Sequence, residues 1–336
     1  MKIHFGIDTR SEVPIYQQIA SSITRSIELK ELKKGDRLPS INAVAGQFSL
    51  SKDTVIKGFK LLQQKGIIAS VHGKGFFINT NKPDLSHNVM LMLDTFTNYK
   101  QDIYHAMLEA FGEKVKVDTY FHHYNFKVFE KLILDNIGNY DYYIIIPLED
   151  ARLEKVIDKL PSQQLYLLDR INDLNPEKYA GIYQDFTSDL SKILATISDH
   201  ISQYQKFILL FRNTITVPPS ELKMEFKRSC EKLGINYQII EDQSAFEVGQ
   251  GDAFLVIDDN DLVNIVRQAW QKNLIPGENI GILSYNETSL KQVVASGISV
   301  ISTDFIDMGK EIVRMVFSDD HTLKANRCLF IDRGSF

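Results

Sequence analysis

Short, continuous apolar runs alternate with helical patterns after residue 88, and this alternation restricts the possible folds more than any other feature of the chain. A strand that is apolar along its whole length has both faces buried, as in a parallel sheet covered by helices. About 250 residues are too many for one small sheet, so we expect two α/β lobes. The predicted strands are 89–93, 142–147, 164–168, 206–211, 253–257 and 279–283, and the predicted helices between them include 103–111, 188–201, 221–233 and 261–272.

The first 80 residues follow a different pattern, which predicts three short helices and a hairpin. Isoleucine recurs at every fourth position from Ile15 to Ile27 and forms an apolar stripe along the first helix. Ser40 and Ser51 are placed to cap the next two helices. Two short strands, 67–71 and 76–79, then flank a turn with the sequence His72-Gly73-Lys74-Gly75.

Charge is distributed unevenly along the chain, whose net charge is −5. Residues 1–80 contain twelve Lys and Arg against six Asp and Glu, so that this part carries +6 and the remainder carries −11. A basic end on an acidic body is typical of a nucleic-acid-binding module joined to a second domain.

Four motifs in this basic part resemble the DNA-binding domain of GntR-type regulators. In order they are Pro14-Ile15-Tyr16-Gln17-Gln18-Ile19, Gly35-Asp36-Arg37-Leu38-Pro39-Ser40, Ser51-Lys52-Asp53-Thr54-Val55 and Gly73-Lys74-Gly75-Phe76-Phe77-Ile78. The resemblance covers nearly all of residues 10–80. It implies a winged helix-turn-helix domain, with a recognition helix that begins near Ser51 and a wing formed by the hairpin.

A recognition helix enters the major groove with its N-terminal residues at the base edges. Lys52 can donate to guanine or to a phosphate, and serine and threonine hydroxyls at helix starts suit phosphate oxygens. Where the family often has a DNA-contacting arginine, this chain has Asn42, which can bond adenine but carries no charge. The predicted DNA-binding residues are Lys34, Arg37, Ser40, Asn42, Ser51, Lys52, Thr54, Lys57, His72, Lys74 and Gly75.

The body resembles the sensor domains of LacI-type regulators. The matching segments, in the order of that family, are Leu167-Leu168-Asp169-Arg170, 253–259, 275–282, Ser284-Tyr285-Asn286-Glu287, 298–303 and 329–335. The resemblance implies a periplasmic-binding-protein-like (type I) domain, with a ligand cleft between two α/β lobes. Together with the head, it indicates an arabinose-repressor-like architecture.

The predicted fold class is therefore an α+β winged helix-turn-helix head plus an α/β two-lobed periplasmic-binding-protein-like domain. We expect a DNA-binding domain at residues 1–79 and an effector-binding domain at 88–336. The short polar stretch 80–87, which contains Pro83, is the predicted linker.

Ligands of open α/β sheets bind beyond the carboxyl ends of the strands, where this chain places Asp94 and several other polar residues. By resemblance, Asp169, Asp258 and Asn286 match effector positions of the family, and either Arg212 or Lys223 replaces its effector-binding arginine. Trp270 could stack on a ligand, but its apolar helix pattern favours a core position. The predicted effector-binding residues are Phe96, Tyr99, Asp169, Arg170, Arg212, Lys223, Asp258 and Asn286.

Enzyme signatures are absent from the sequence, which has no Walker loop, Gly-x-Ser-x-Gly or His-Glu-x-x-His motif. We therefore predict no enzyme activity, no catalytic residue, no cofactor and no metal site. His122 and His123 are adjacent and cannot present both rings on one face of a regular element, so we expect them in a surface loop or strand. Cys230 and Cys328 suggest neither a disulfide framework nor a zinc site.

The sequence contains no signal peptide and no apolar run of eighteen residues, so we expect a cytoplasmic protein without a membrane partner. We predict a homodimeric regulator, by default a repressor of a sugar-utilisation operon, that binds double-stranded operator DNA. A monosaccharide such as arabinose or fucose would bind in the interlobe cleft; a phosphosugar or nucleoside stays open. The alternative is a sugar or nucleoside receptor whose head contacts protein, and salt-sensitive binding to duplex DNA distinguishes the two.

Overall fold

The computed structural model describes residues 6–8, 13–80, 87–113, 115–212, 218–241 and 246–336. The chain divides into two compact units. One comprises residues 1–94, 111–180 and 316–321, and the other comprises residues 95–110, 181–315 and 322–336. Most of the predicted linker, residues 81–86, lies outside the described ranges, so the predicted domain boundaries stay a prediction.

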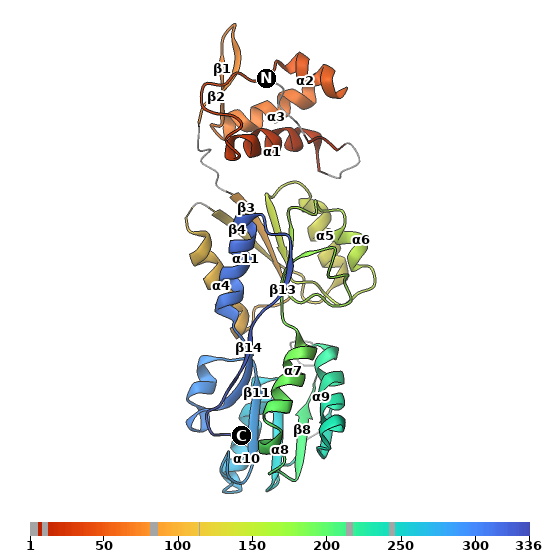
Figure 1. Ribbon diagram of the computed structural model, residues 1–336, viewed down its shortest axis with the longest axis vertical. Coiled ribbons are helices and arrows are strands. Elements are labelled where there is room, and N and C mark those ends of the chain that lie inside the picture. The colour runs from red at the N-terminus through yellow and green to blue at the C-terminus, as the bar shows by residue number, and fades with distance from the viewer. Residues whose placement is uncertain (1–5, 9–12, 81–86, 114, 213–217, 242–245) are drawn as a thin grey trace. The chain divides into compact units, whose positions relative to one another are not determined.

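The described N-terminal residues form three helices and a two-stranded antiparallel hairpin (Figure 1). Ile19, Ile23 and Ile27 of the first helix are buried and belong to one hydrophobic core with Val55 and Phe59 of the third. The isoleucine stripe therefore has the role that its spacing predicts. The elements are α1 (Ile15–Glu28), α2 (Ile41–Phe48), α3 (Lys52–Gln64), β1 (Ile68–Val71) and β2 (Gly75–Ile78).

The first large sheet has six strands in the order β13-β7-β6-β5-β3-β4. Its core includes Met90 and Tyr143 from the strands, with Phe129 and Ile133 from a covering helix. The strands are β3 (His87–Leu93), β4 (Val115–Phe121), β5 (Tyr142–Ile145), β6 (Leu165–Asp169), β7 (Ala180–Tyr183) and β13 (Leu323–Ala325). The helices that contribute to this core are α5 (Phe126–Asn136) and α6 (Leu153–Ile157).

Two further helices, α4 (Asn98–Phe111) and α11 (Phe305–Ser318), approach each other closely. A Cβ atom at Gly309 would lie 2.5 Å from the carbonyl oxygen of Ile103 and 2.8 Å from the Cβ of Ala106. Glycine is therefore required at this crossing, because any side chain would push the two helices apart.

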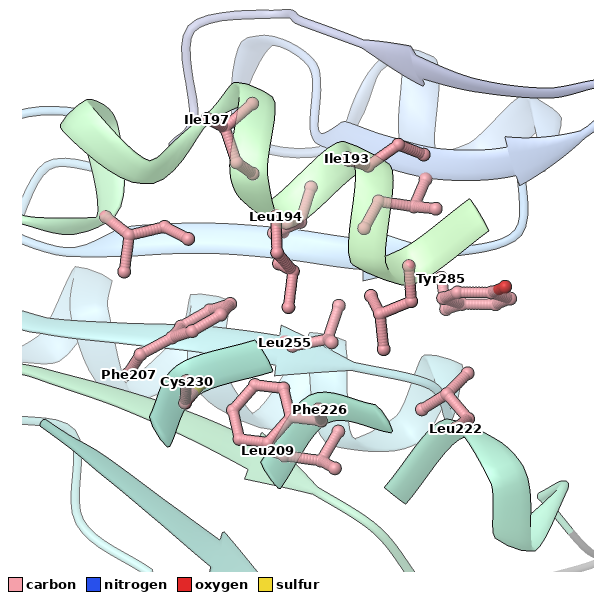
Figure 2. Packing of buried hydrophobic residues seen from close by; sticks show 14 of the residues in the cluster. Ile193, Leu194, Ile197, Phe207, Leu209, Leu222, Phe226, Cys230, Leu255 and Tyr285 are labelled. Atoms are coloured by element: carbon pink, nitrogen blue, oxygen red, sulfur yellow. The ribbon is translucent and has the colours of Figure 1, made fainter. Parts of the chain in front are cut away.

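The second large sheet has the order β14-β12-β11-β10-β8-β9, and only its strand β14 runs antiparallel, against β12. Figure 2 shows one covered face, where Leu194 and Phe226 pack with the strand residues Phe207 and Leu255. On the other face, Ile265 packs with the remaining strand side chains. The strands are β8 (Lys206–Leu210), β9 (Tyr237–Ile240), β10 (Asp252–Val256), β11 (Gly281–Tyr285), β12 (Ser299–Thr303) and β14 (Cys328–Ile331).

The helices around the second sheet are α7 (Phe186–Thr196), α8 (Ser198–Ile201), α9 (Ser220–Leu233), α10 (Asp259–Gln271) and the short 3₁₀ turns η1 (Ser289–Gln292) and η2 (Val294–Ser296). The core position predicted for Trp270 in α10 is wrong, because its side chain is 81% exposed. None of the helices within the described ranges combines the length and hydropathy that a membrane span requires.

Candidate DNA-binding surface and effector site

The starts of α2 and α3 are held by the two predicted capping serines. Ser40 Oγ accepts a hydrogen bond from the N–H of Ala43 at 3.2 Å, and Ser51 Oγ accepts one from the N–H of Thr54 at 3.1 Å. The hydroxyl oxygens of Ser51 and Thr54 also lie 2.7 Å apart. These side chains therefore fix the start of each helix, and this local role accompanies any contact that they make with DNA.

Exposed cations follow Ser51 along α3, the predicted recognition helix. Lys52 lies in the first turn of α3 and Lys57 follows further along, and both side chains are exposed. Neither lysine, nor Lys74 in the wing, forms a salt bridge with any residue in the described ranges. Their charges are thus available to an external anion such as a phosphate backbone.

The wing is a tight hairpin with basic residues around its tip. Val71 pairs with Gly75, so that His72, Gly73 and Lys74 form the connection between the strands. Gly75 has a φ of 101°, a conformation that a residue with a side chain rarely adopts. Arg37 lies beside this glycine, because its Nε would be 3.7 Å from a Cβ atom there.

The remaining predicted DNA-binding residues, Lys34 and Asn42, are exposed in the loop before α2 and in its first turn. All eleven predicted residues therefore lie in the winged helix at exposed or half-buried positions. Their contact with DNA stays a prediction.

In the first large sheet, polar residues follow several strands and are buried there. Asp94 after β3 is 1% exposed, and Asp169, at the end of β6, is fully buried with a φ of 70°. Arg170 comes next and is 9% exposed. The carboxyl ends of these strands thus carry buried ionisable side chains, and their contact with an effector stays a prediction.

His122, which follows β4, corrects the prediction that the histidine pair lies at the surface. Its ring is fully buried, whereas His123 is exposed. Nδ1 of His122 accepts a hydrogen bond from the N–H of Tyr124 at 3.2 Å, and Nε2 lies 3.1 Å from the carbonyl oxygen of Ile146. This pairing fits a neutral ring with its proton on Nε2.

The two predicted stacking rings at the start of α4 differ in their surroundings. Tyr99 packs against Phe305 with the ring centroids 4.5 Å apart. Phe96 is 46% exposed and packs edge-to-face with Tyr104, with the ring centroids 5.7 Å apart. Phe96 therefore offers the more accessible aromatic face.

In the second large sheet, Arg212, Asp258 and Asn286 follow β8, β10 and β11. Arg212 forms a salt bridge with Asp261 at 3.3 Å, and these two residues are 9% and 8% exposed. Burial raises the pKa of Asp261, while the guanidinium of Arg212 opposes this shift and Asp258 adds to it. Asp258 itself caps α10 by accepting the N–H of Asn260 at 2.8 Å.

A buried lysine connects these strand ends. Lys291 Nζ donates to the carbonyl oxygens of Tyr285 and Asn286 at 2.9 and 2.7 Å, and it lies 3.1 Å from a carboxylate oxygen of Asp259. Burial lowers the pKa of Lys291, which the Asp259 carboxylate counteracts. We call this group the second-sheet edge; its members are Arg212, Asp258, Asp259, Asp261, Asn286 and Lys291.

Sequence reasoning missed three members of this edge, Asp259, Asp261 and Lys291. Asp261 belongs to an acidic run, Asp258-Asp259-Asn260-Asp261, directly after an apolar strand, and that run is a signal for it. Lys291 gives no such signal, because a single lysine in a polar stretch is normally predicted to lie exposed on the surface.

Lys223 lies apart from the second-sheet edge. Its ammonium pairs with Glu241 at 2.9 Å and lies 5.3 Å from the Phe211 ring centroid. It lines an open groove of about 530 Å³ together with Met224 and Tyr237, and none of the other predicted effector residues lines that groove. Of the two basic candidates, the structure therefore brings Arg212 and not Lys223 to Asp258 and Asn286.

A winged helix whose exposed lysines pair with no carboxylate in the described ranges is typical of DNA-binding transcriptional regulators, and here it is joined to two α/β sheets with polar strand ends. Residues 15–78 match the model of the gntR family of bacterial regulatory proteins. The chain is 45% identical over 67 residues to the uncharacterized HTH-type regulator YydK of Bacillus subtilis, covering 20% of this chain and 28% of YydK. It is 36% identical over 88 residues to the transcriptional repressor YtrA of the same species, covering 26% of this chain and 68% of YtrA.

The chain belongs to the gntR family of bacterial regulatory proteins. Its relatives are transcriptional regulators, in agreement with the prediction that it is not an enzyme.

Solved structures match the body rather than the head. An uncharacterized protein from Actinobacillus succinogenes aligns with a TM-score of 0.63 at 9% identity, over 74% of this chain and 99% of its own. A periplasmic binding protein/LacI regulator from Alkaliphilus metalliredigens, complexed with D-xylulofuranose, aligns with a TM-score of 0.57 at 10% identity. The alignment covers 74% of this chain and 99% of that one. A dimeric lac repressor aligns with a TM-score of 0.59 at 13% identity, over 74% of this chain and 98% of its own. The predicted fold class is confirmed for both parts.

Proposed function

We propose that this regulator controls a sugar-utilisation operon by binding operator DNA through its winged helix and a small sugar through its body. The observation that carries the DNA part is the set of exposed cations on α3 and the wing. Lys52, Lys57 and Lys74 pair with no carboxylate in the described ranges. A surface of this kind gains affinity by neutralising phosphates.

The sugar part of the proposal is supported by the strand ends of both large sheets. Asp94 and Asp169 in the first sheet, and Asp258 and Asn286 in the second, offer oxygen acceptors suited to hydroxyl groups. One structure with the fold of the body is a complex with D-xylulofuranose. We expect a pentose or deoxyhexose such as arabinose or fucose, and its binding between the lobes stays a prediction.

We propose repression that the sugar relieves, since YtrA is named a repressor. A sugar can release DNA only through different affinities for the two states of the regulator. A DNA-binding regulator of this kind would act in the cytoplasm.

We propose that the regulator is a homodimer on a roughly palindromic operator, with one head on each half-site. An exposed apolar stripe on α10 supports a partner copy: Val263 and Trp270, seven residues apart and so on one helical face, are 51% and 81% exposed. One structure that shares the fold of the body is named a dimeric repressor.

Equilibrium binding of the full chain to duplexes from its own upstream region tests the proposal. We expect affinity to fall steeply between 50 and 200 mM salt and to fall again when the effective sugar is added. A chain that binds sugar but ignores every such duplex at low salt would instead support the receptor alternative.

A further inference from the structure

We propose that Asp261 is a specificity-determining residue of the effector site, which it shapes by pairing with Arg212, so that the second-sheet edge accepts an uncharged sugar and rejects a phosphate ester. The inference rests on the proposed function and narrows its ligand class.

The cations at this edge already have carboxylate partners. Arg212 pairs with Asp261 at 3.3 Å, Lys291 pairs with Asp259 at 3.1 Å, and nearby Arg333 pairs with Glu287. Lys291 also donates to two carbonyl oxygens. A phosphate arriving here would therefore compete with existing partners rather than meet an available positive charge.

Among the described groups named here, four are carboxylates and three are cations. Asp258 is the fourth carboxylate, and its charge acts on both Asp261 and Lys291. A phosphate ester, with a charge of about −1.5 to −2 at neutral pH, would be repelled here.

The same edge contains buried acceptors that lack donors. Asp261 is 8% exposed, and its Oδ2 accepts no hydrogen bond from the described residues. The side-chain carbonyl oxygen of Asn286 is a second buried acceptor without a partner there. The buried hydroxyl of Thr288, also without a partner there, can accept or donate. A buried acceptor without a donor is costly, and sugar hydroxyls supply donors, whereas a fully ionised phosphate group only accepts.

Release of operator DNA from the full chain by matched pairs of ligands tests this inference. The pairs are arabinose with arabinose 5-phosphate, xylulose with xylulose 5-phosphate, and glucose with glucose 6-phosphate. For whichever sugar releases the DNA, we expect half-maximal release at a free-sugar concentration at least tenfold lower than the concentration of its ester that has the same effect. An ester that works as well or better would overturn the inference and leave the sugar-responsive function standing. Operator binding that no member of the panel alters would count against both.

Two variants assign the discrimination to Asp261. Asp261→Asn leaves the Arg212 charge without its partner, so the advantage of the free sugar should shrink at least tenfold. The conservative variant Asp261→Glu keeps a carboxylate for Arg212 and should keep the advantage of the free sugar, even if Asp261→Asn proves too unstable to measure.

The matched control is Asp158→Asn, which removes a carboxylate paired with Lys178 at 2.6 Å near the surface. This variant should leave unchanged the ratio between the ester concentration and the free-sugar concentration that release the DNA. An unchanged ratio in a folded Asp261→Asn protein, or a lost ratio in a folded Asp261→Glu protein, would remove Asp261 from its proposed role.

Discussion

Several candidate binding residues also stabilise the local structure by capping helices. This second role decides which substitutions can test binding without a loss of stability. Asp258 accepts the N–H of Asn260 and caps α10, while Ser40 and Ser51 cap the helices of the head. Removal of such a cap costs about 0.5–2 kcal/mol in stability. A test of binding at these positions therefore needs a replacement that can still cap.

Asp258→Asn meets this requirement, because asparagine caps a helix about as well as aspartate. We expect the variant to fold and to bind operator DNA within about twofold of the wild type. Its response to the effective sugar should weaken at least tenfold, since one acceptor of the proposed site loses its charge. Sugar-dependent release of DNA measures this, with Asp150→Asn, a surface residue paired with Arg152, as control. A wild-type response would remove Asp258 from the effector site.

Lys291→Met tests the buried lysine that connects the strand ends. The change leaves two carbonyl oxygens and Asp259 without their donor. Breaking a fully buried pair costs about 3–5 kcal/mol, and we expect about 2–4 because the Asp259 side chain is 35% exposed. Urea unfolding measures the loss; Lys178→Met, which breaks exposed surface pairs, should cost under about 1 kcal/mol. Equal losses in the two variants would contradict the role assigned to Lys291.

At the scale of elements, the fully apolar strands could be predicted from the sequence. The runs that became β3, β5, β6, β8 and β10 are buried on both faces, so their composition alone marks them. β4 was not predicted, because the sheet pairs it on one side only and its sequence mixes Val115 and Val117 with Lys116 and Asp118. The charge pairing at the second-sheet edge was also missed, since it depends on how α10 and η1 fold back onto the strand ends.

Asp189, near the start of α7, should make the stability of the fold depend on pH. Burial raises the pKa of Asp189 from 3.8 to about 6, and Asp185 adds to the shift. The folded state therefore holds this proton more tightly than the unfolded state. Stability is lost as pH rises from about 4 to 6, and the loss is complete above that range.

The variant Asp189→Asn removes the free-energy cost of ionising this buried carboxyl group. We expect the free energy of unfolding at pH 7 to rise by about 1–3 kcal/mol relative to the wild type. The advantage should shrink as the pH is lowered to 4.5, because the wild-type carboxyl regains its proton. Urea unfolding at both pH values measures the difference. A gain that is the same at both pH values, or a loss at pH 7, would contradict the assignment.

At the scale of the whole molecule, the proposed homodimer depends on the apolar stripe of α10. Trp270→Glu places a charge on an 81% exposed aromatic position, so it should leave the folded subunit intact. It should convert a dimer to a monomer in sedimentation experiments and weaken operator binding. Met224→Glu, at a 60% exposed position on α9, is the matched control and should stay dimeric. A dimeric Trp270→Glu protein would place the partner copy elsewhere.

The central claim is that Lys52, Lys57 and Lys74, which pair with no carboxylate in the described ranges, bind the phosphate backbone of DNA. The salt dependence of operator affinity tests it most directly, in the wild type and in Lys52→Ala/Lys57→Ala/Lys74→Ala. Each lost phosphate contact should reduce the slope of log affinity against log salt by about 0.9, so three contacts reduce it by about 2.7. An unchanged slope in a correctly folded triple variant, or no salt dependence in the wild type, would contradict the account.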